Sequence, residues 1–231
     1  MITKYTYLLV NMGCILIPFL FSFHPKLKFN KQFKFILIPL LIVALLFSIW
    51  DVLFTEAQVW EFNPKFVIGY FLFGLPLEEY LFFICIPFAC LFTYHCLGIL
   101  LKNKADNLNI KYIFILLAVL LFTIGVFNLN RAYTSVTFIA TALLIFILLF
   151  LKVKFLKLFG ITYLLILVPF TISNGILTGS FSNEPVVIYN DSENLTVRLL
   201  NIPIEDTIYG LLLILLNVSF YEFYKSKFKM Q

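Results

Sequence analysis

The sequence predicts an all-α integral membrane protein with about seven transmembrane helices, built as two parallel three-helix repeats joined by a linker helix. The 231-residue chain is 62% hydrophobic and 13% charged, with a mean hydropathy of +1.00, a composition that a soluble domain rarely has. Its apolar residues form seven runs of about the 17 to 25 residues that cross a bilayer. In addition, two acidic tetrads recur 127 residues apart, each at the start of an apolar run.

The seven runs follow one another along the whole chain. We expect spans at about residues 5–23, 33–53, 77–101, 111–128, 132–151, 158–176 and 203–224. The first run is followed by lysines and lacks a small-residue cleavage pattern, so it indicates a retained helix and not a signal peptide. The expected domains are a first repeat at 1–104, a linker span at 105–130 and a second repeat at 131–231.

Basic residues predict the orientation of the spans. Alternate loops carry 13 of the lysines and arginines on one side and 4 on the other. Because basic loops favour the cytoplasm, we expect a multi-pass cell-membrane protein with its N-terminus outside and its C-terminus inside. This distribution also accounts for the net charge of +5 without a nucleic-acid partner.

The acidic tetrads define the internal repeat. Residues 76–79 read Pro-Leu-Glu-Glu and residues 203–206 read Pro-Ile-Glu-Asp, and the same offset pairs Phe82 with Tyr209. Each repeat has three spans, an odd number, so it begins and ends on opposite sides of the membrane. Only a fourth crossing between the two copies lets both run in the same direction. We therefore expect both tetrads on the same side of the membrane.

A second set of matches lies upstream, where the offset changes to 123. There Asp51 pairs with Asn174, and Thr55 pairs with Thr178. All four are expected near the outer ends of their spans, where they can orient the acids or simply cap the helices. The segment 66–75 is too apolar for an exposed loop, so we expect it to dip into the membrane as a partial helix against the first tetrad.

Four carboxylates beside apolar spans indicate function, because charge in a bilayer costs about 2.5 to 3.5 kcal/mol even on mild scales. Capping of the helix starts by these acids is the structural alternative. However, adjacent carboxylates in a water-poor site cannot easily both be ionised, and a neutral acid beside an anionic base suits general acid and base catalysis. The candidate catalytic residues are Glu78, Glu79, Glu205 and Asp206. Which of them donates the proton stays open.

Aromatic side chains follow each tetrad on the same helical face. Phe82 and Phe83 lie three and four residues after Glu79, and Tyr209 lies in the same relation to the second tetrad. Such rings can stabilise a cation, although a chain this rich in aromatic residues places some there by chance. The cysteines lie in apolar spans without a CxxC pair or a histidine cluster, so we expect packing roles and no metal site.

These motifs resemble the membrane lycopene cyclases of the heterodimeric type, in their tandem-fused form. The first copy matches through Trp50-Asp51, Thr55, the run from Trp60 to Asn63, Gly69 and the run from Pro76 to Phe83. The second copy matches through the runs 174–179, 185–190 and 203–206. Two motif sets in the right order make the resemblance specific, and it covers nearly the whole chain except the fourth span.

The resemblance implies an enzyme that cyclises the linear ends of lycopene to β-ionone rings, giving γ-carotene and then β-carotene. Some relatives make ε-rings or act on C50 carotenoids, so the product stays open. It also implies that the acids work with a positioning and substrate-binding set. That set comprises Asp51, Thr55, Trp60, Asn63, Phe82, Phe83, Asn174, Thr178, Tyr189, Asn190 and Tyr209.

The expected partners are lycopene and other linear carotenoids, the lipid bilayer and, as further candidates, other enzymes of the carotenoid pathway. The glycines form no GxGxxG fingerprint, so we expect no bound flavin or nicotinamide. The alternative function is a carotenoid-binding or transport protein that uses the acidic pairs as a proton or cation site. A retinal protein is disfavoured because no lysine lies between Lys157 and Lys225, and a prenyltransferase because aspartate-rich motifs are missing.

Overall fold

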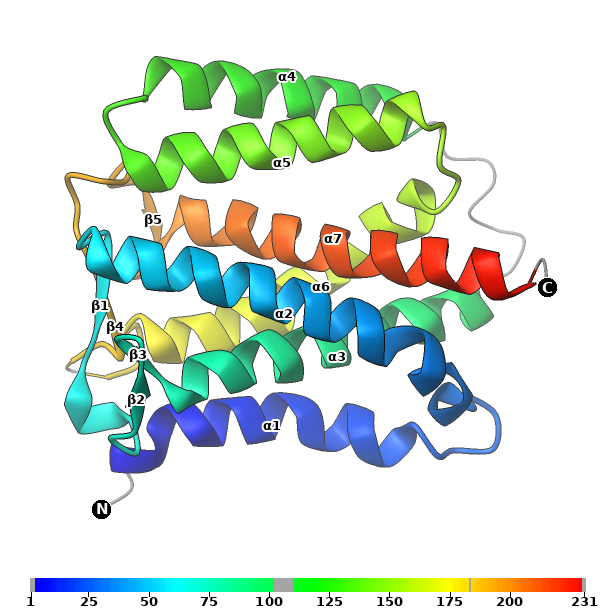
Figure 1. Cartoon of the computed structure of the whole chain (residues 1–231), viewed down its shortest axis with the longest axis horizontal. Coiled ribbons are helices and arrows are strands. Elements are labelled where there is room, and N and C mark those ends of the chain that lie inside the picture. Colours follow the sequence, from blue (N-terminus) through cyan, green and yellow to red (C-terminus); the bar gives the residue numbers. More distant parts are fainter. Residues whose placement is uncertain (1–2, 102–109, 183, 230–231) are drawn as a thin grey trace.

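The chain forms a bundle of long helices that lie side by side (Figure 1). This computed structural model describes residues 3–101, 110–182 and 184–229; the expected boundary between the first repeat and the linker, at 104/105, and the basic residues Lys102 and Lys104 lie outside them. In the described part the helices are α1 (Thr6–Phe21), α2 (Phe33–Glu56), α3 (Leu77–Leu100), α4 (Lys111–Phe127), α5 (Ala132–Phe150), α6 (Leu156–Leu177) and α7 (Ile204–Lys229). The predicted all-α class is confirmed, and each helix coincides with one predicted span.

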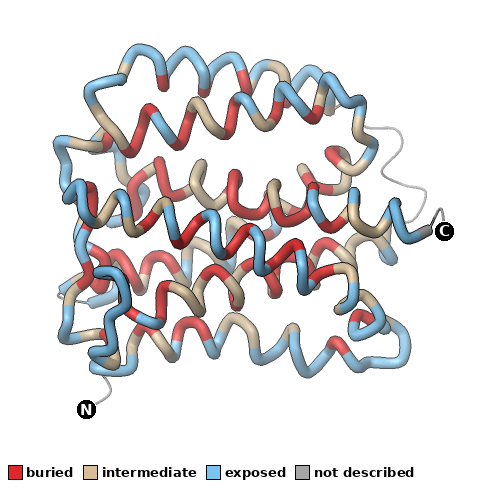
Figure 2. The backbone as a smooth tube through the Cα atoms, in the orientation of Figure 1, coloured by how far each residue is buried: buried red, intermediate tan, exposed pale blue. Residues whose placement is uncertain are grey.

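Six helical segments are long and apolar enough to cross a membrane, α1 being counted together with the 3-10 turn before it as Thr3–Phe21, of 19 residues. Helix α4 is a shorter apolar helix of 17 residues. Their outward surfaces are apolar as well. On α1, for example, Leu16, Ile17 and Leu20 are each more than half exposed. Figure 2 shows buried residues on the inward faces and exposed residues along most of α1 and α4. Apolar side chains that face outward over whole helices indicate a lipid environment.

The two halves of the chain pack in corresponding ways. Helix α1 packs on α3 as α5 packs on α7, while α2 packs on α7 as α6 packs on α3. Helix α4 lies along the outer side of α5. The N-termini of α3 and α7, which carry the tetrads, lie at the same end of the bundle, so the expected parallel arrangement is confirmed (Figure 1).

Short strands form a layer at this end of the bundle (Figure 1). They are β1 (Trp60–Phe62), β2 (Phe71–Leu72), β3 (Leu75–Pro76), β4 (Val187–Tyr189), β5 (Arg198–Leu199) and β6 (Ile202–Pro203). Strands β2 and β3 form a hairpin before α3, as β5 and β6 do before α7. Strands β1 and β4 pair with each other, so this sheet joins the two repeats.

The β1–β4 pairing obeys a local two-fold relation. Glu61 lies opposite Ile188, its own equivalent at the 127-residue offset. The backbone N–H of Asn63 donates to the carbonyl oxygen of Val186 at 2.8 Å, and that of Asn190 donates to the carbonyl oxygen of Val59 at 2.9 Å. Two copies of one loop therefore pair with each other antiparallel around an axis between them.

The prediction of a partial helix over 66–75 is wrong. A single 3-10 turn at Pro64–Phe66 is followed by the β2–β3 hairpin. The two turn residues, Phe73 and Gly74, both have positive φ, at 49° and 80°, which matches the twist of a two-residue hairpin and not a helix. The segment still contacts the tetrad, because the backbone N–H of Ile68 donates to Glu78 Oε1 at 2.6 Å.

Candidate active site

A cavity of about 230 Å³ lies inside the bundle, next to the loop layer. Helices α1, α3, α6 and α7 supply most of its walls, and β1 and β4 contribute side chains at the loop end. Most lining residues are apolar or aromatic. Three carboxylates also line the cavity, namely Asp51 of α2, Glu79 of α3 and Asp206 of α7.

The start of each helix places its acids. Strand β3 ends at Pro76 and α3 begins at the next residue, and likewise β6 ends at Pro203 and α7 begins at Ile204. Glu79 and Asp206 therefore lie in a first helical turn, where free backbone N–H groups and the helix dipole favour negative charge. Both side chains are almost fully buried, with exposed fractions of 6% and 5%.

Glu79 has a tyrosine and a second carboxyl group as neighbours. The Tyr7 hydroxyl of α1 donates to Glu79 Oε2 at 2.5 Å. Asp51 lies beside Glu79 in the lining of the cavity, close enough for the two carboxyl groups to interact directly. The Tyr209 hydroxyl of α7 donates to Asp51 Oδ1 at 2.5 Å. The first repeat therefore contributes a pair of touching carboxyl groups, each with one tyrosine donor.

Asp206 has three donors. Tyr133 of α5 donates to Asp206 Oδ1 at 2.6 Å. Asn174 of α6 and Tyr189 of β4 donate to Asp206 Oδ2 at 2.6 Å and 2.8 Å. A carboxylate that accepts several hydrogen bonds is stabilised as an anion. The second repeat thus provides one buried carboxylate that accepts three hydrogen bonds from the protein.

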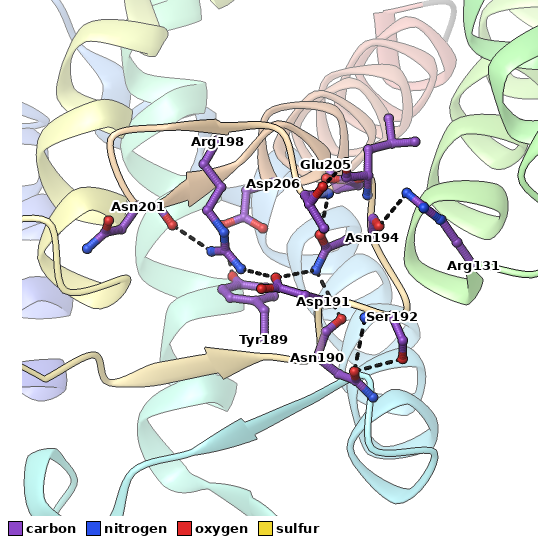
Figure 3. Close-up of polar contacts among 12 residues, drawn as sticks. Arg131, Tyr189, Asn190, Asp191, Ser192, Asn194, Arg198, Asn201, Glu205 and Asp206 are labelled. Carbon is purple, nitrogen blue, oxygen red and sulfur yellow. Dashed lines mark hydrogen bonds and ion pairs between the residues drawn. The ribbon is translucent and has the colours of Figure 1, made fainter.

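A polar network holds the loop above Asp206 (Figure 3). The guanidinium of Arg198 lies 5.8 Å from the ring centroid of Tyr189, pairs with Asp191 Oδ1 at 2.5 Å and donates to the carbonyl oxygen of Asn201 at 2.9 Å. The hydrogen bond from Arg198 to Asp191 lowers the pKa of that carboxyl group. The network therefore holds Tyr189 in place over Asp206.

The first acid of each tetrad points away from the cavity. Glu78 Oε1 accepts from the backbone N–H of Ile68, and Glu205 Oε1 accepts from the backbone N–H of Leu195 at 2.7 Å and from Thr134 Oγ1 at 2.6 Å. Both glutamates are fully buried, and neither lines the cavity. The two acids of a tetrad therefore lie in different surroundings, one against the loop backbone and one in the cavity.

Comparison with known families decides what kind of protein this is. The family model described as lycopene cyclase matches the chain twice, at residues 4–97 and 130–224. The chain belongs to the lycopene cyclase family. The two segments bear out the resemblance seen in the motifs and the tandem form, with one match on each side of α4. No curated protein and no solved structure matches the chain.

Most of the aromatic residues expected at the candidate site line the cavity. Trp60, Phe82, Tyr189 and Tyr209 are among its walls. Phe83 is fully buried outside the lining, where it packs against Phe47 with ring centroids 5.8 Å apart.

The expected polar residues divide into two groups. Asp51 and Asn174 contact the acids, as described above. Asn63 Nδ2 instead donates to the carbonyl oxygen of Pro185 at 3.2 Å, and Asn190 Nδ2 donates to that of Gln58 at 3.1 Å. These two asparagines therefore hold the loops of the two repeats together.

The threonines of the expected set lie elsewhere. Thr55 Oγ1 is buried without a hydrogen-bond partner, and Thr178 Oγ1 lies 3.4 Å from Ser180 Oγ. Neither threonine lines the cavity. Within the described residues, no group of three or more histidine, cysteine or acidic side chains is placed to hold a metal ion.

Sequence reasoning missed Tyr7 and Tyr133. Each lies near the start of the first span of its repeat, 126 residues apart, which is within one residue of the offset between the tetrads. That near-equal offset was the available signal. That signal is weak because tyrosines are frequent at membrane interfaces, where no contact with an acid is needed.

Proposed function

We propose that this lycopene cyclase converts the linear ends of lycopene into β-ionone rings, giving γ-carotene and then β-carotene. A carboxylic acid protonates the terminal double bond, so its O–H bond breaks and a C–H bond forms, leaving a tertiary cation. The neighbouring alkene attacks that cation and closes the ring. A carboxylate then removes a ring proton. Atoms and electrons balance without an oxidant or a reductant.

One observation carries this proposal: Glu79 and Asp206, contributed by different repeats, line the same apolar cavity. We assign the proton transfers to these two residues together with Asp51. The cavity aromatics Trp60, Phe82 and Tyr209 can stabilise the cation through their ring faces. Exclusion of water protects the cation from capture.

We assign a different role to Glu78 and Glu205. Because each accepts a backbone N–H from the loop ten residues earlier, each fixes its hairpin against the helix that follows. They act as positioning residues, and their carboxylates do not reach the substrate. The catalytic group is therefore smaller than the four acids of the tetrads.

The size and place of the cavity suit a long lipid-soluble substrate. Its volume of about 230 Å³ is smaller than the roughly 300 to 1,000 Å³ of sites that enclose a whole drug-sized ligand, so it holds one end of a carotenoid at a time. Its lining includes Pro18 of α1, which is half-buried, and Pro169 of α6, which is exposed. The substrate enters from the bilayer between α1 and α6.

The loop layer with the two acidic sites lies on the outer side of the cell membrane in this proposal, with the N-terminus outside and the C-terminus in the cytoplasm. The uneven distribution of basic residues supports it. Labelling of a cysteine placed at exposed Asn190 by a membrane-impermeant thiol reagent in intact cells tests this orientation. Labelling only after cell lysis would reverse it.

Pigment analysis of lycopene-accumulating cells that express the chain tests the activity. We expect γ-carotene and β-carotene in place of lycopene, and loss of both in Glu79→Gln and Asp206→Asn variants. ε-Ring products would change the product assignment. Unchanged lycopene, with the protein present in the membrane, would contradict the cyclase proposal and favour a carotenoid-binding or transport protein.

A further inference from the structure

The two repeats differ in the groups next to the acids, and one of these differences is between a carboxyl group and an amide. Asp51 of α2 and Asn174 of α6 are equivalent in the repeat alignment, and each touches the cavity acid of a tetrad. Asp51 contacts Glu79 of its own repeat, and Asn174 contacts Asp206 of its own repeat. The tyrosines match, because Tyr7 and Tyr133 make the same contact in both halves. The contrast between a carboxyl group and an amide is therefore one chemical asymmetry of the cavity, beside the tyrosines Tyr189 and Tyr209, whose counterparts in the first repeat are Phe62 and Phe82.

This asymmetry decides where a proton is held. Asp51 and Glu79 lie side by side in one buried cavity, and because ionised carboxylates only accept hydrogen bonds, a hydrogen bond between them requires that one carries a proton. Two charges so close together in a buried site repel each other strongly, which favours the singly protonated pair. Each carboxyl group also accepts one tyrosine hydroxyl.

The opposite holds for Asp206. The Asn174 amide donates where Asp51 supplies a carboxyl group in the other half, and two tyrosines complete three donors. Three donors fill three of the about four lone-pair sites of the carboxylate, and hydrogen bonds to the charged form favour that form. The site therefore favours the anion before substrate binds.

We propose that the Asp51–Glu79 pair holds a single proton and is the acid of the cyclisation, and that Asp206 is the base. This inference rests on the cyclase function proposed above and assigns the two roles within it. Because the halves are chemically different, the cavity works as one site that acts on one chain end at a time.

The proton balance closes within the site. The pair gives its proton to the terminal alkene carbon of the substrate, which leaves two carboxylates beside the new cation, each with its tyrosine donor. Asp206 takes the ring proton after ring closure and becomes neutral. Return of that proton to the pair restores the starting state, so the reaction is a net isomerisation.

Other titratable groups face these acids. Around the Asp51–Glu79 pair they are Tyr7 of α1, Glu78 and Tyr80 of α3, Tyr189 of β4, and Asp206 and Tyr209 of α7. Around Asp206 they are Tyr133 of α5, Tyr189 of β4, Glu79 of α3, and Glu205 and Tyr209 of α7, with Arg198 stacked over Tyr189. All of these are present in both variants below, so the comparison isolates the two substituted positions.

Two isosteric substitutions test the assignment: Asp51→Asn and Asn174→Asp. The rate of lycopene cyclisation is measured as a function of pH for the purified protein in lipid vesicles, with wild type as reference. For Asp51→Asn we expect the rate at neutral pH to fall roughly 100-fold or more and to recover as the pH is lowered, because Glu79 alone must then bind the proton.

For Asn174→Asp we expect the reverse slope. The new carboxyl group removes one donor from Asp206 and adds an acidic neighbour, so the base stays protonated at neutral pH and the rate recovers as the pH is raised. Opposite pH slopes in the two variants are the expected result, and a purely structural role would not produce them.

Two results would overturn the assignment while leaving the cyclase function intact. One is an Asp51→Asn protein that keeps the wild-type rate, and the other is a variant whose rate falls without any change in pH profile. If Asp51→Asn fails to accumulate in the membrane, the slope of Asn174→Asp decides alone. A wild-type protein that makes no ring would instead contradict the proposed function itself.

Discussion

Tyr7 and Tyr133 make the same contact in the two halves of the bundle. The Tyr7 hydroxyl lies 2.5 Å from Glu79 Oε2, and the Tyr133 hydroxyl lies 2.6 Å from Asp206 Oδ1. Each tyrosine comes from the first helix of its repeat and each acid from the third. The repeat therefore preserves a donor and acceptor pair, and the cavity has one such pair from each half.

Replacement of either tyrosine by phenylalanine should reduce cyclisation without preventing folding. The ring stays in place, but a carboxylate oxygen loses its donor, and hydrogen bonds to charged groups contribute about 1.5 to 3 kcal/mol. We expect a roughly 10- to 100-fold lower rate for Tyr7→Phe and for Tyr133→Phe. Initial rates on lycopene in vesicles measure this, and wild-type rates in both variants would show that these donors are not needed.

The two acids of the first tetrad should respond differently to the same change. Glu79→Gln replaces a carboxyl group in the cavity and should lower the rate by roughly 100- to 10,000-fold. Glu78→Gln keeps a carbonyl oxygen that can accept the N–H of Ile68, so most activity should remain. Pigment analysis with equal membrane amounts of both proteins compares them directly.

Glu78→Ala serves as the structural control for that pair. It removes the acceptor for the Ile68 N–H and should lower the free energy of unfolding in detergent by about 1 to 3 kcal/mol, because a buried donor loses its partner. If Glu78→Gln abolishes cyclisation while its melting temperature stays unchanged, Glu78 takes part in the chemistry and our division of the tetrad is wrong.

A disulfide across the proposed access path should block the reaction reversibly. Cys14 of α1 and Ser173 of α6 both line the cavity, on the two helices that border the proposed access path. A Ser173→Cys substitution therefore places a thiol on each of the two helices, so that a disulfide between them would tie the path closed. We expect oxidation to stop lycopene conversion and reduction to restore it.

The matched control for this disulfide is the double variant Cys14→Ser/Ser173→Cys. It cannot form the bond, but like the wild type it has one serine and one cysteine at the two positions. It should remain active under oxidising conditions. Full activity of the cross-linked protein, verified by mass spectrometry, would show that substrate enters somewhere else.

The asparagines that join the loops should affect stability more than chemistry. Asn63→Ala removes the donor to the Pro185 carbonyl, and Asn190→Ala removes the equivalent donor to the Gln58 carbonyl. Each change should cost about 0.5 to 1.5 kcal/mol of unfolding free energy. Thermal unfolding in detergent measures this loss, and a variant that keeps its melting temperature but loses activity would place that asparagine in the reaction.

The Asp191–Arg198 pair should make the loop over Asp206 sensitive to acid. Arg198 lowers the pKa of Asp191 in the folded protein, so the pair stabilises the fold above the unfolded pKa of about 3.9 and this contribution is lost as the pH falls through the lower folded value. Asp191→Asn should therefore lower stability at neutral pH, by at most about 1 kcal/mol because water screens the pair. Melting temperatures that differ equally at neutral and strongly acidic pH would exclude this ion pair as the cause.

Much of the architecture could be predicted because a bilayer imposes few choices. Apolar runs of spanning length predicted every helix, and the tetrad offset predicted that α3 and α7 begin at the same end of the bundle. The prediction from local sequence was wrong over 66–75, where the apolar composition suggested a helix. There the backbone conformation at Phe73 and Gly74 formed a hairpin instead.

The site could be predicted only in outline. The amino-acid sequence by itself determined the class of protein, the repeat and the carboxylates at two helix starts, because these depend on hydropathy and on spacing along the chain. Only the tertiary structure decided which acid of each tetrad faces the cavity, that Asp51 touches Glu79, and that Asn63 and Asn190 hold the loops together. Adjacent residues on a helix point about 100° apart, so their surroundings depend on how distant helices and loops pack around them.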